Sequence, residues 1–204
     1  YGNNSRRFRR KSIISKKIKN NNKYRVVVGY PPIESEKGVP LLSQNRQFQY
    51  FHAPTYIYPM VPAYGATLLK DYGCEVLWLD GIAEKMSYKD WEKSLKDFNP
   101  DLLMIETKSP VVKEHWKIID GLKEKFPKLK IVIVGDHVTH NPQETLDSCK
   151  VDYIITGGDY DFMILDLVKS LTNKEPLPGG IWTRSHDSSI VLNPEISKEV
   201  EGKM

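Results

Sequence analysis

Five short apolar segments, separated by amphipathic ones, dominate the chain from Arg25 onward. They cover residues 25–29, 75–79, 101–105, 130–134 and 151–155 and consist largely of valine, isoleucine and leucine. Because their apolar residues are contiguous instead of alternating with polar ones, each segment is predicted to be a strand buried on both faces. Strands of this kind are typical of a parallel sheet that is covered by helices.

The segments between these strands have helical periodicity. In residues 111–126, Trp116, Ile119 and Leu122 recur at three- and four-residue spacing, so this helix is predicted to bury one stripe. Trp116 and its neighbour His115 are therefore interpreted as packing residues. The other helices are predicted at residues 59–72, 87–98, 142–149 and 160–171.

The alternation of strands and helices predicts an α/β fold with a doubly wound, five-stranded parallel sheet, flavodoxin-like or Rossmann-like. Right-handed crossovers lead to the strand order 2-1-3-4-5. Two short extra strands are expected near the C-terminus, at residues 180–183 and 189–192. In such sheets ligands bind beyond the carboxyl ends of the strands, so the loops after strands 1, 3, 4 and 5 form the candidate site.

Two of these loops differ from the rest in length or composition. A long loop with four prolines, residues 30–58, follows the first strand, and loops of this length often carry function. A polar loop, residues 135–141, follows the fourth strand and contains Asp136, His137 and His140. These three side chains could ligate a metal, but they lie too close together to close a site without another loop.

Charge is distributed unevenly along the chain. Residues 1–23 hold nine lysines and arginines and no acidic residue, whereas the rest of the chain holds 21 basic and 26 acidic residues. We predict a basic, disordered arm at residues 1–23, an α/β domain at residues 24–184 and an extension or linker at residues 185–204. Such an arm can also contact nucleic acid or an anionic membrane. No specific nucleic-acid binding is expected of the domain, which lacks a basic stripe interleaved with aromatics.

The cysteines and the absence of targeting signals favour a cytoplasmic protein. Cys74 and Cys149 lie far apart without the spacing of metal ligands, so both are interpreted as buried free thiols. The chain shows no secretory signal and no apolar run near the roughly 20 residues of a membrane span.

Several common chemistries of this fold are excluded by the loop residues. The segment Gly29-Tyr-Pro-Pro32 lacks the glycine pattern of a dinucleotide site or a phosphate-binding loop. The strand ends lack the acidic residues of a response regulator, and no serine or cysteine lies in a nucleophile elbow. The remaining loops offer hydroxyls, amides, imidazole and, at Gly157 and Gly158, bare backbone. They favour a large neutral ligand with many amides.

Seven segments within residues 24–184 form an ordered set of motifs. They are Tyr30-Pro-Pro32, Pro59-Met-Val-Pro-Ala-Tyr-Gly-Ala66, Gly73-Cys-Glu-Val-Leu-Trp-Leu-Asp80, Asn99-Pro-Asp-Leu102, Gly135-Asp-His-Val-Thr-His-Asn-Pro-Gln-Glu-Thr-Leu146, Val151-Asp-Tyr-Ile-Ile-Thr-Gly-Gly-Asp-Tyr160 and Pro178-Gly-Gly-Ile-Trp-Thr183. In the order and spacing of these motifs, the chain resembles the cobalamin-binding N-terminal domain of cobalamin-dependent radical-SAM enzymes.

The resemblance implies that cobalamin binds at the carboxyl edge of the sheet, with its dimethylbenzimidazole tail displaced into the crevice between sheet and helices and without a histidine ligand to cobalt. It implies a radical-SAM catalytic domain as partner, in cis or in trans, and a methyltransferase or, less commonly, a cyclase reaction. The cofactor contacts expected by position are Pro31, Tyr58, Thr107, Ser109, Gly135, Asp136, His137, Val138, Thr139, Gly157, Gly158 and Asp159.

Some features depart from the family pattern. His137 falls one place earlier than the family histidine, Gly158 and Asp159 replace an acidic pair, and the D-x-H-x-x-G motif is absent after the first strand. The 204 residues contain no C-x-x-x-C-x-x-C motif, so an iron–sulfur cluster and S-adenosylmethionine are expected only in the catalytic domain. The alternative is a non-catalytic interaction or regulatory domain that has lost cofactor binding, with the basic arm contacting nucleic acid or membrane.

Overall fold

The computed structural model describes residues 23–41, 49–54, 56–184 and 190–191. In chain order the elements are β1 (Arg25–Tyr30), β2 (Val39–Leu41), β3 (Gln49–Phe51), α1 (Met60–Tyr72), β4 (Glu75–Asp80), α2 (Tyr88–Phe98), β5 (Leu102–Glu106), α3 (Val112–Lys125), β6 (Lys130–Val134), α4 (Asp136–His140), α5 (Pro142–Ser148), β7 (Tyr153–Ile155), α6 (Tyr160–Asn173), β8 (Ile181–Arg184) and β9 (Ile190–Val191). The basic arm, except Lys23, and most of the C-terminal extension lie outside the described residues, so the division into arm, domain and extension stays a prediction.

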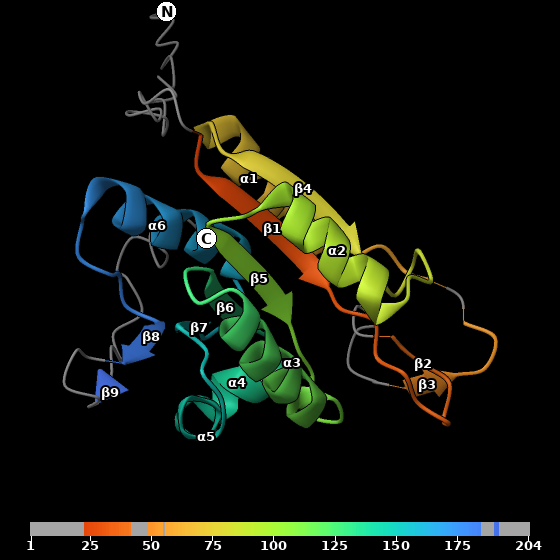
Figure 1. Cartoon of the computed structure of the whole chain (residues 1–204). Helices are drawn as coiled ribbons and strands as arrows, with labels where there is room; N and C mark the ends of the chain where they lie inside the picture. The colour runs from red at the N-terminus through yellow and green to blue at the C-terminus, as the bar shows by residue number, and fades with distance from the viewer. Residues whose placement is uncertain (1–22, 42–48, 55, 185–189, 192–204) are drawn as a thin grey trace, which may run out of the picture.

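Seven strands form one sheet in the order β4-β1-β5-β6-β7-β8-β9 (Figure 1). The first five in this order pair in parallel, and β8 and β9 continue the sheet in antiparallel orientation. Numbered along the chain, the parallel strands have the order 2-1-3-4-5. The predicted doubly wound fold is therefore confirmed, including the two short C-terminal strands.

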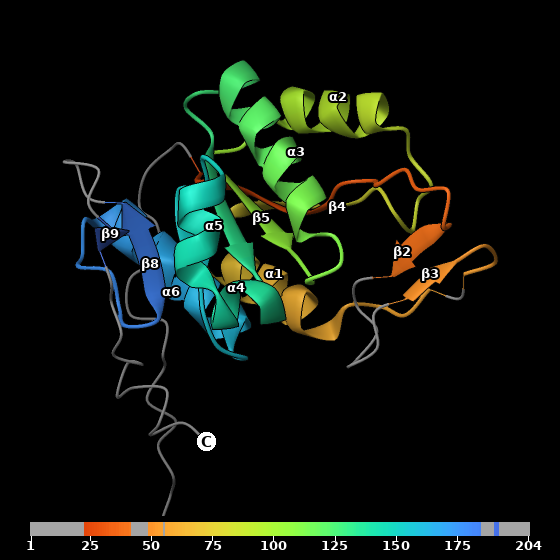
Figure 2. The ribbon, with the colours of Figure 1, turned by 90° about the horizontal axis from the view of Figure 1, so that it is seen from below.

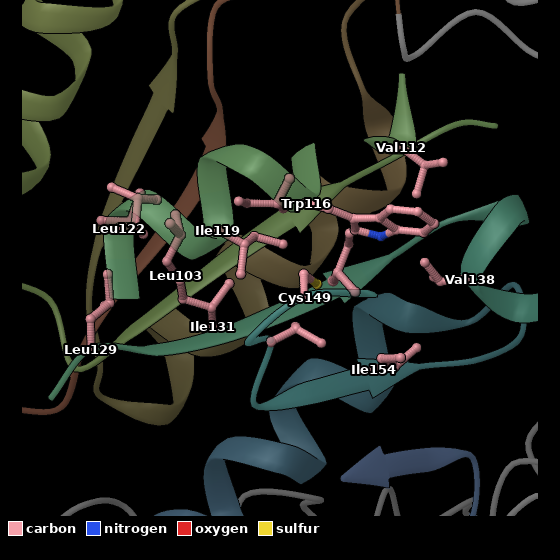
Figure 3. Close-up of a cluster of buried hydrophobic side chains, with 14 of the residues drawn as sticks. Leu103, Val112, Trp116, Ile119, Leu122, Leu129, Ile131, Val138, Cys149 and Ile154 are labelled. Carbon is pink, nitrogen blue, oxygen red and sulfur yellow. The ribbon is translucent and has the colours of Figure 1, made fainter. Parts of the chain in front are cut away.

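Helices cover both faces of this sheet, with α2 and α3 on one face and α1 and α6 on the other (Figure 2). Successive strand residues point to opposite faces, so Leu103 and Ile131 enter the core under α2 and α3, while Leu102 and Val132 enter the core under α1 and α6. Figure 3 shows the first of these cores, in which Trp116 of α3 packs above the strands.

The residues that were predicted to pack are buried. His115 is fully buried and Trp116 nearly so. Cys74 and Cys149 are both buried free thiols, and burial raises the pKa of Cys74 to about 12 and that of Cys149 to about 11. Thiols with pKa values this high stay protonated and unreactive near neutral pH. These interpretations of the sequence are confirmed.

The long loop of residues 30–58 contains a hairpin that was not predicted from the sequence. Strands β2 and β3 pair in antiparallel orientation and lie beyond the carboxyl end of β1 (Figures 1 and 2). Val39 and Phe51 of the hairpin pack against Tyr30 and Ile82. The hairpin depends on these distant apolar partners, which local pattern does not reveal, because an isolated two-stranded hairpin is marginal in water.

The prediction of a polar loop at residues 135–141 is wrong in part, because this segment contains the short helix α4. The hydroxyl of Thr139 donates to the carbonyl of Gly135 at 2.9 Å, and Nδ1 of His140 lies 2.8 Å from the carbonyl oxygen of Asp136. Polar side chains thus bond the backbone of their own turn, and residues that usually favour loops here close a helix.

Gly135 marks a close contact between the ends of β5 and β6. Its φ is +121°, and a Cβ on it would lie 2.2 Å from the carbonyl oxygen of Thr107. Only glycine combines this backbone conformation with such an approach.

Among the described residues, no helix is long and apolar enough to cross a membrane.

We expect Gly135→Ala to lower the free energy of unfolding by about 2–4 kcal/mol, because the added methyl group meets backbone and strains φ. Gly121 of α3 is the matched control, since a Cβ there would meet no atom within 4 Å. Gly121→Ala should raise stability by up to about 1 kcal/mol through helix propensity. Urea denaturation followed by circular dichroism measures both, and a Gly135→Ala protein as stable as the wild type would contradict the close contact.

Candidate ligand-binding site at the carboxyl edge of the sheet

The strand order reverses between β1 and β5, which are neighbours in the sheet. The chain leaves β1 toward β4 on one side and leaves β5 toward β6 on the other. The two loops therefore diverge and open a crevice at the carboxyl edge, where doubly wound sheets bind ligands. Tyr30 ends β1 and Glu106 ends β5, so both lie at this point.

The Glu106 carboxylate collects groups from several elements. It is only 5% exposed, and Tyr30 donates a hydrogen bond to Oε2 at 2.5 Å. Tyr160, the first residue of α6, donates a longer bond to Oε1 at 3.4 Å. Nζ of Lys108 lies 4.0 Å from Oε1 and 2.8 Å from Oδ2 of Asp136 in α4. The ends of β1 and β5 and the starts of α4 and α6 are thereby joined. We call these five residues the Glu106 cluster.

Burial determines the electrostatics of this cluster. It raises the pKa of Glu106 above its ordinary value, although the tyrosine hydrogen bonds and Lys108 act in the opposite direction. Burial and the Glu106 carboxylate raise the pKa values of Tyr30 and Tyr160 well above the ordinary tyrosine value. Both phenols therefore keep their protons and act as donors to Glu106.

We expect Glu106→Gln to reduce the loss of stability that accompanies a rise in pH. The folded-state pKa of Glu106 lies above the unfolded value, so its contribution to stability is fully present below the unfolded pKa and is lost as pH rises through the folded pKa. Glutamine keeps an oxygen that can accept the Tyr30 bond and carries no charge. Urea denaturation from about pH 4.5 to about pH 8 should show a smaller decrease for the variant.

Glu36→Gln is the control for this experiment, because Glu36 is exposed. It should follow the wild-type pH dependence. An unchanged pH dependence in Glu106→Gln would contradict an ionised, buried carboxylate at this position.

The two hydroxyl residues predicted after β5 lie in different surroundings. Thr107 is fully buried, and its Oγ1 lies 2.7 Å from Nδ1 of His115. Burial lowers the pKa of His115 to about 3, so this imidazole is neutral. Ser109 is exposed, with Oγ 3.1 Å from Nδ1 of His137. Ser109 is therefore available to a ligand at the surface, whereas Thr107 supports the edge from inside.

The loops after β6 and β7 are joined by Thr139. Its hydroxyl oxygen accepts a hydrogen bond from the backbone N–H of Gly157 at 3.1 Å. Gly157, Gly158 and Asp159 are all exposed. A Cβ on either glycine would meet no atom within 4 Å, so the backbone here is open to a large ligand.

The other predicted site residues of α4 differ in burial. Val138 is buried in the core under α3, and Asp136 is exposed and paired with Lys108. Nε2 of His137 lies 3.3 Å from Oε2 of Glu144. Within the described ranges no three His, Cys, Asp or Glu side chains gather as a metal site. Asp136, His137 and His140 are thus engaged with separate partners.

Apolar side chains border the site on the side of α1 and α6. Pro31 is buried at the end of β1, whereas Tyr58 is 60% exposed. Tyr58 stacks on Trp78 at 5.5 Å between ring centroids, and Trp78 also contacts Tyr30 at 5.9 Å. The exposed large apolar side chains among the described residues are Ile57, Tyr58, Met60, Tyr64 and Phe162.

The structure brings most of the predicted loops together but adds residues that the sequence reading missed. Tyr30, Glu106, Lys108 and Tyr160 were not predicted as site residues. One local signal existed, because Glu106 directly follows four apolar residues of a buried strand. An acidic residue in that place needs partners, but their identity depends on the tertiary structure.

The fold and this edge define a doubly wound α/β domain with a ligand site at the switch point. A family model described as "B12 binding domain" matches residues 52–164, more than half of the chain. The chain belongs to this B12-binding domain family, and cobalamin is its cofactor.

Two curated proteins are similar in sequence. The chain is 26% identical over 135 residues to an uncharacterized methyltransferase of Pyrococcus horikoshii, covering 66% of this chain and 29% of the relative. It is 25% identical over 192 aligned residues to cytidylyl-2-hydroxyethylphosphonate methyltransferase of Streptomyces wedmorensis, covering 83% of this chain and 35% of the relative. The chain thus spans about a third of the length of these relatives.

Solved structures share the fold. The cobalamin-dependent S-adenosylmethionine radical enzyme OxsB, with aqua-cobalamin and S-adenosylmethionine bound, superposes with a TM-score of 0.65 at 14% identity over 90% of this chain and 24% of that chain. The radical S-adenosylmethionine methyltransferase TsrM from Kitasatospora setae, with cobalamin and a [4Fe-4S] cluster bound, gives 0.58 at 17% identity over 85% of this chain and 29% of that chain.

Proposed function

We propose that this chain holds cobalamin at the carboxyl edge of its sheet, without a histidine ligand to cobalt, and presents it to a radical-SAM catalytic domain that performs methyl transfer. The observation that carries the proposal is the open backbone at Gly157 and Gly158, on the same edge of the sheet as the switch point of a B12-binding fold. The catalytic domain acts in cis or in trans. We also propose a cytoplasmic location, which suits two buried free thiols.

The residues at the edge fit a corrinoid, which is a large macrocycle with apolar faces and a rim of amides. Exposed Tyr58 and Tyr64 offer apolar surface, and the exposed hydroxyl of Ser109 offers a hydrogen-bonding group. Gly157 and Gly158 leave space for a bulky ligand and free backbone for its amides. The twelve contacts predicted from sequence remain part of this proposal, with Pro31, Thr107, Gly135 and Val138 as buried supports.

Bound cobalamin would supply the methyl carrier chemistry. The chain would supply position and exclusion of water. Thr139 and Gly157 hold the loops after β6 and β7 at a fixed spacing. The Lys108–Asp136 ion pair does the same for the loop after β5 and the start of α4. These contacts within the chain hold the loops in place, so little ordering is needed on binding.

Two of the described histidines favour a site without a histidine ligand. His115 is fully buried, and His137 contacts Ser109 through Nδ1 and Glu144 through Nε2. His52 and His140 are exposed, so experiment must exclude both as cobalt ligands. His186 lies outside the described residues.

The partner domain is proposed from the relatives. OxsB is a cobalamin-dependent S-adenosylmethionine radical enzyme, and TsrM is a radical S-adenosylmethionine methyltransferase with cobalamin bound; this chain covers 24% and 29% of them. Both curated relatives are named as methyltransferases. Methyl transfer is therefore the reaction that these names support best for the complete system.

Mixing the purified chain with hydroxocobalamin and desalting it should leave a stoichiometric amount of corrinoid bound. After reduction to cobalt(II), electron paramagnetic resonance should show no hyperfine splitting from an axial nitrogen. His52→Ala and His140→Ala should each change neither the affinity nor the spectrum. A chain that retains no corrinoid would sink the proposal, and a nitrogen splitting that disappears in either variant would sink its claim of a site without histidine.

Gly158→Trp should weaken cobalamin binding at least about tenfold, because the side chain fills space that is open in the structure. The fold should be unaffected, since a Cβ at Gly158 meets no neighbour. Gly121→Trp is the matched control, because it adds the same side chain on α3 at a similarly open position. Isothermal titration measures both variants, and equal affinities would place the corrinoid elsewhere.

A further inference from the structure

Tyr160 is a partly exposed member of the Glu106 cluster that contacts the buried Glu106 carboxylate. It is partly exposed and directly follows the open segment 157–159. Its hydroxyl donates to Oε1 of Glu106 at 3.4 Å, and the Asp136 carboxylate is close enough to contribute to the raised pKa of the phenol. With its proton committed to Glu106, the Tyr160 oxygen retains lone pairs that can only accept hydrogen bonds.

A corrinoid presents two kinds of rim group. Side-chain amides carry N–H donors, whereas corrinoids in which an amide is hydrolysed carry a carboxylate that only accepts near neutral pH. An acceptor oxygen in the site therefore favours an amide over a carboxylate. The surrounding charge also disfavours a carboxylate, because the two acidic residues Glu106 and Asp136 are balanced in the cluster by Lys108 alone.

We propose that Tyr160 binds a corrin side-chain amide through its hydroxyl oxygen, and that Glu106 is the positioning residue that makes this oxygen an obligate acceptor, so that the site selects amidated over carboxylated corrinoids. This inference rests on the proposed function and adds a specificity to it.

The role of Glu106 follows from the direction of one proton. While Glu106 accepts the Tyr160 proton, a ligand carboxylate would face an oxygen that cannot donate to it. Glutamine at position 106 can donate its own N–H to the Tyr160 oxygen and release the phenol proton toward the ligand. The variant site would then accept a carboxylate. A residue that merely supported the fold would not change ligand preference in this way.

The test compares hydroxocobalamin with its separated monocarboxylate derivatives, each lacking one corrin amide, by isothermal titration at about pH 8. The wild-type chain should bind at least one derivative roughly fivefold or more weakly than hydroxocobalamin, the effect of about one hydrogen bond. Tyr160→Phe and Glu106→Gln should each bring that ratio to within about twofold. Circular dichroism verifies that both variants are folded.

Tyr153→Phe is the matched control, because Tyr153 begins β7 at the opposite end of the strand from the site. It should keep the wild-type ratio. Equal wild-type affinity for hydroxocobalamin and every derivative would overturn the specificity, as would an unchanged ratio in Tyr160→Phe, while leaving the proposed function intact. A wild-type chain that binds no corrinoid would overturn both.

Discussion

The central strands of this sheet are buried on both faces, and this constraint determines where polar chemistry can occur. Every residue of β5 is buried, and its neighbours β1 and β6 are nearly as enclosed. Helices fill both faces with apolar side chains. Charged and hydrogen-bonding groups can therefore gather only at the strand ends. The reversal of strand order selects the point at that edge where loops diverge and a ligand has room.

Glu106 illustrates the energetic cost of burying a charged group at this edge. Its carboxylate lies almost wholly out of water, and burial outweighs two tyrosine hydrogen bonds and a nearby lysine in raising its pKa. With a neutral side chain of the same shape at this position, the folded protein would be more stable near neutral pH. Retention of such a group at a candidate site is typical of residues whose charge serves binding or catalysis.

Two further features lie near this edge of the sheet: the β2–β3 hairpin and the exposed apolar side chains at the starts of α1 and α6. The β2–β3 hairpin and its apolar contacts extend the molecule beyond the end of β1 (Figures 1 and 2). The starts of α1 and α6 carry exposed Met60, Tyr64 and Phe162. Exposed apolar side chains thus border the candidate site.

The sequence by itself determined the layers of the fold and the edge that carries the candidate site. Contiguous apolar strands and periodic helices specify a parallel sheet, because those patterns reflect which faces must be buried. Gly135 and Gly157, which the sequence marked as candidate site residues, both have a positive φ in the structure, and Gly135 also lies against the backbone of Thr107. The ordered motifs also indicated cobalamin before any contact was known.

Only the tertiary structure decided which side chains meet. Tyr30, Glu106 and Tyr160 lie far apart along the chain, and their hydrogen bonds exist because strand order places β1 beside β5. The hairpin and α4 likewise depend on partners or turn bonds that propensity does not describe. Local pattern reports how each segment meets water, whereas a site depends on distances between segments, and packing sets those distances.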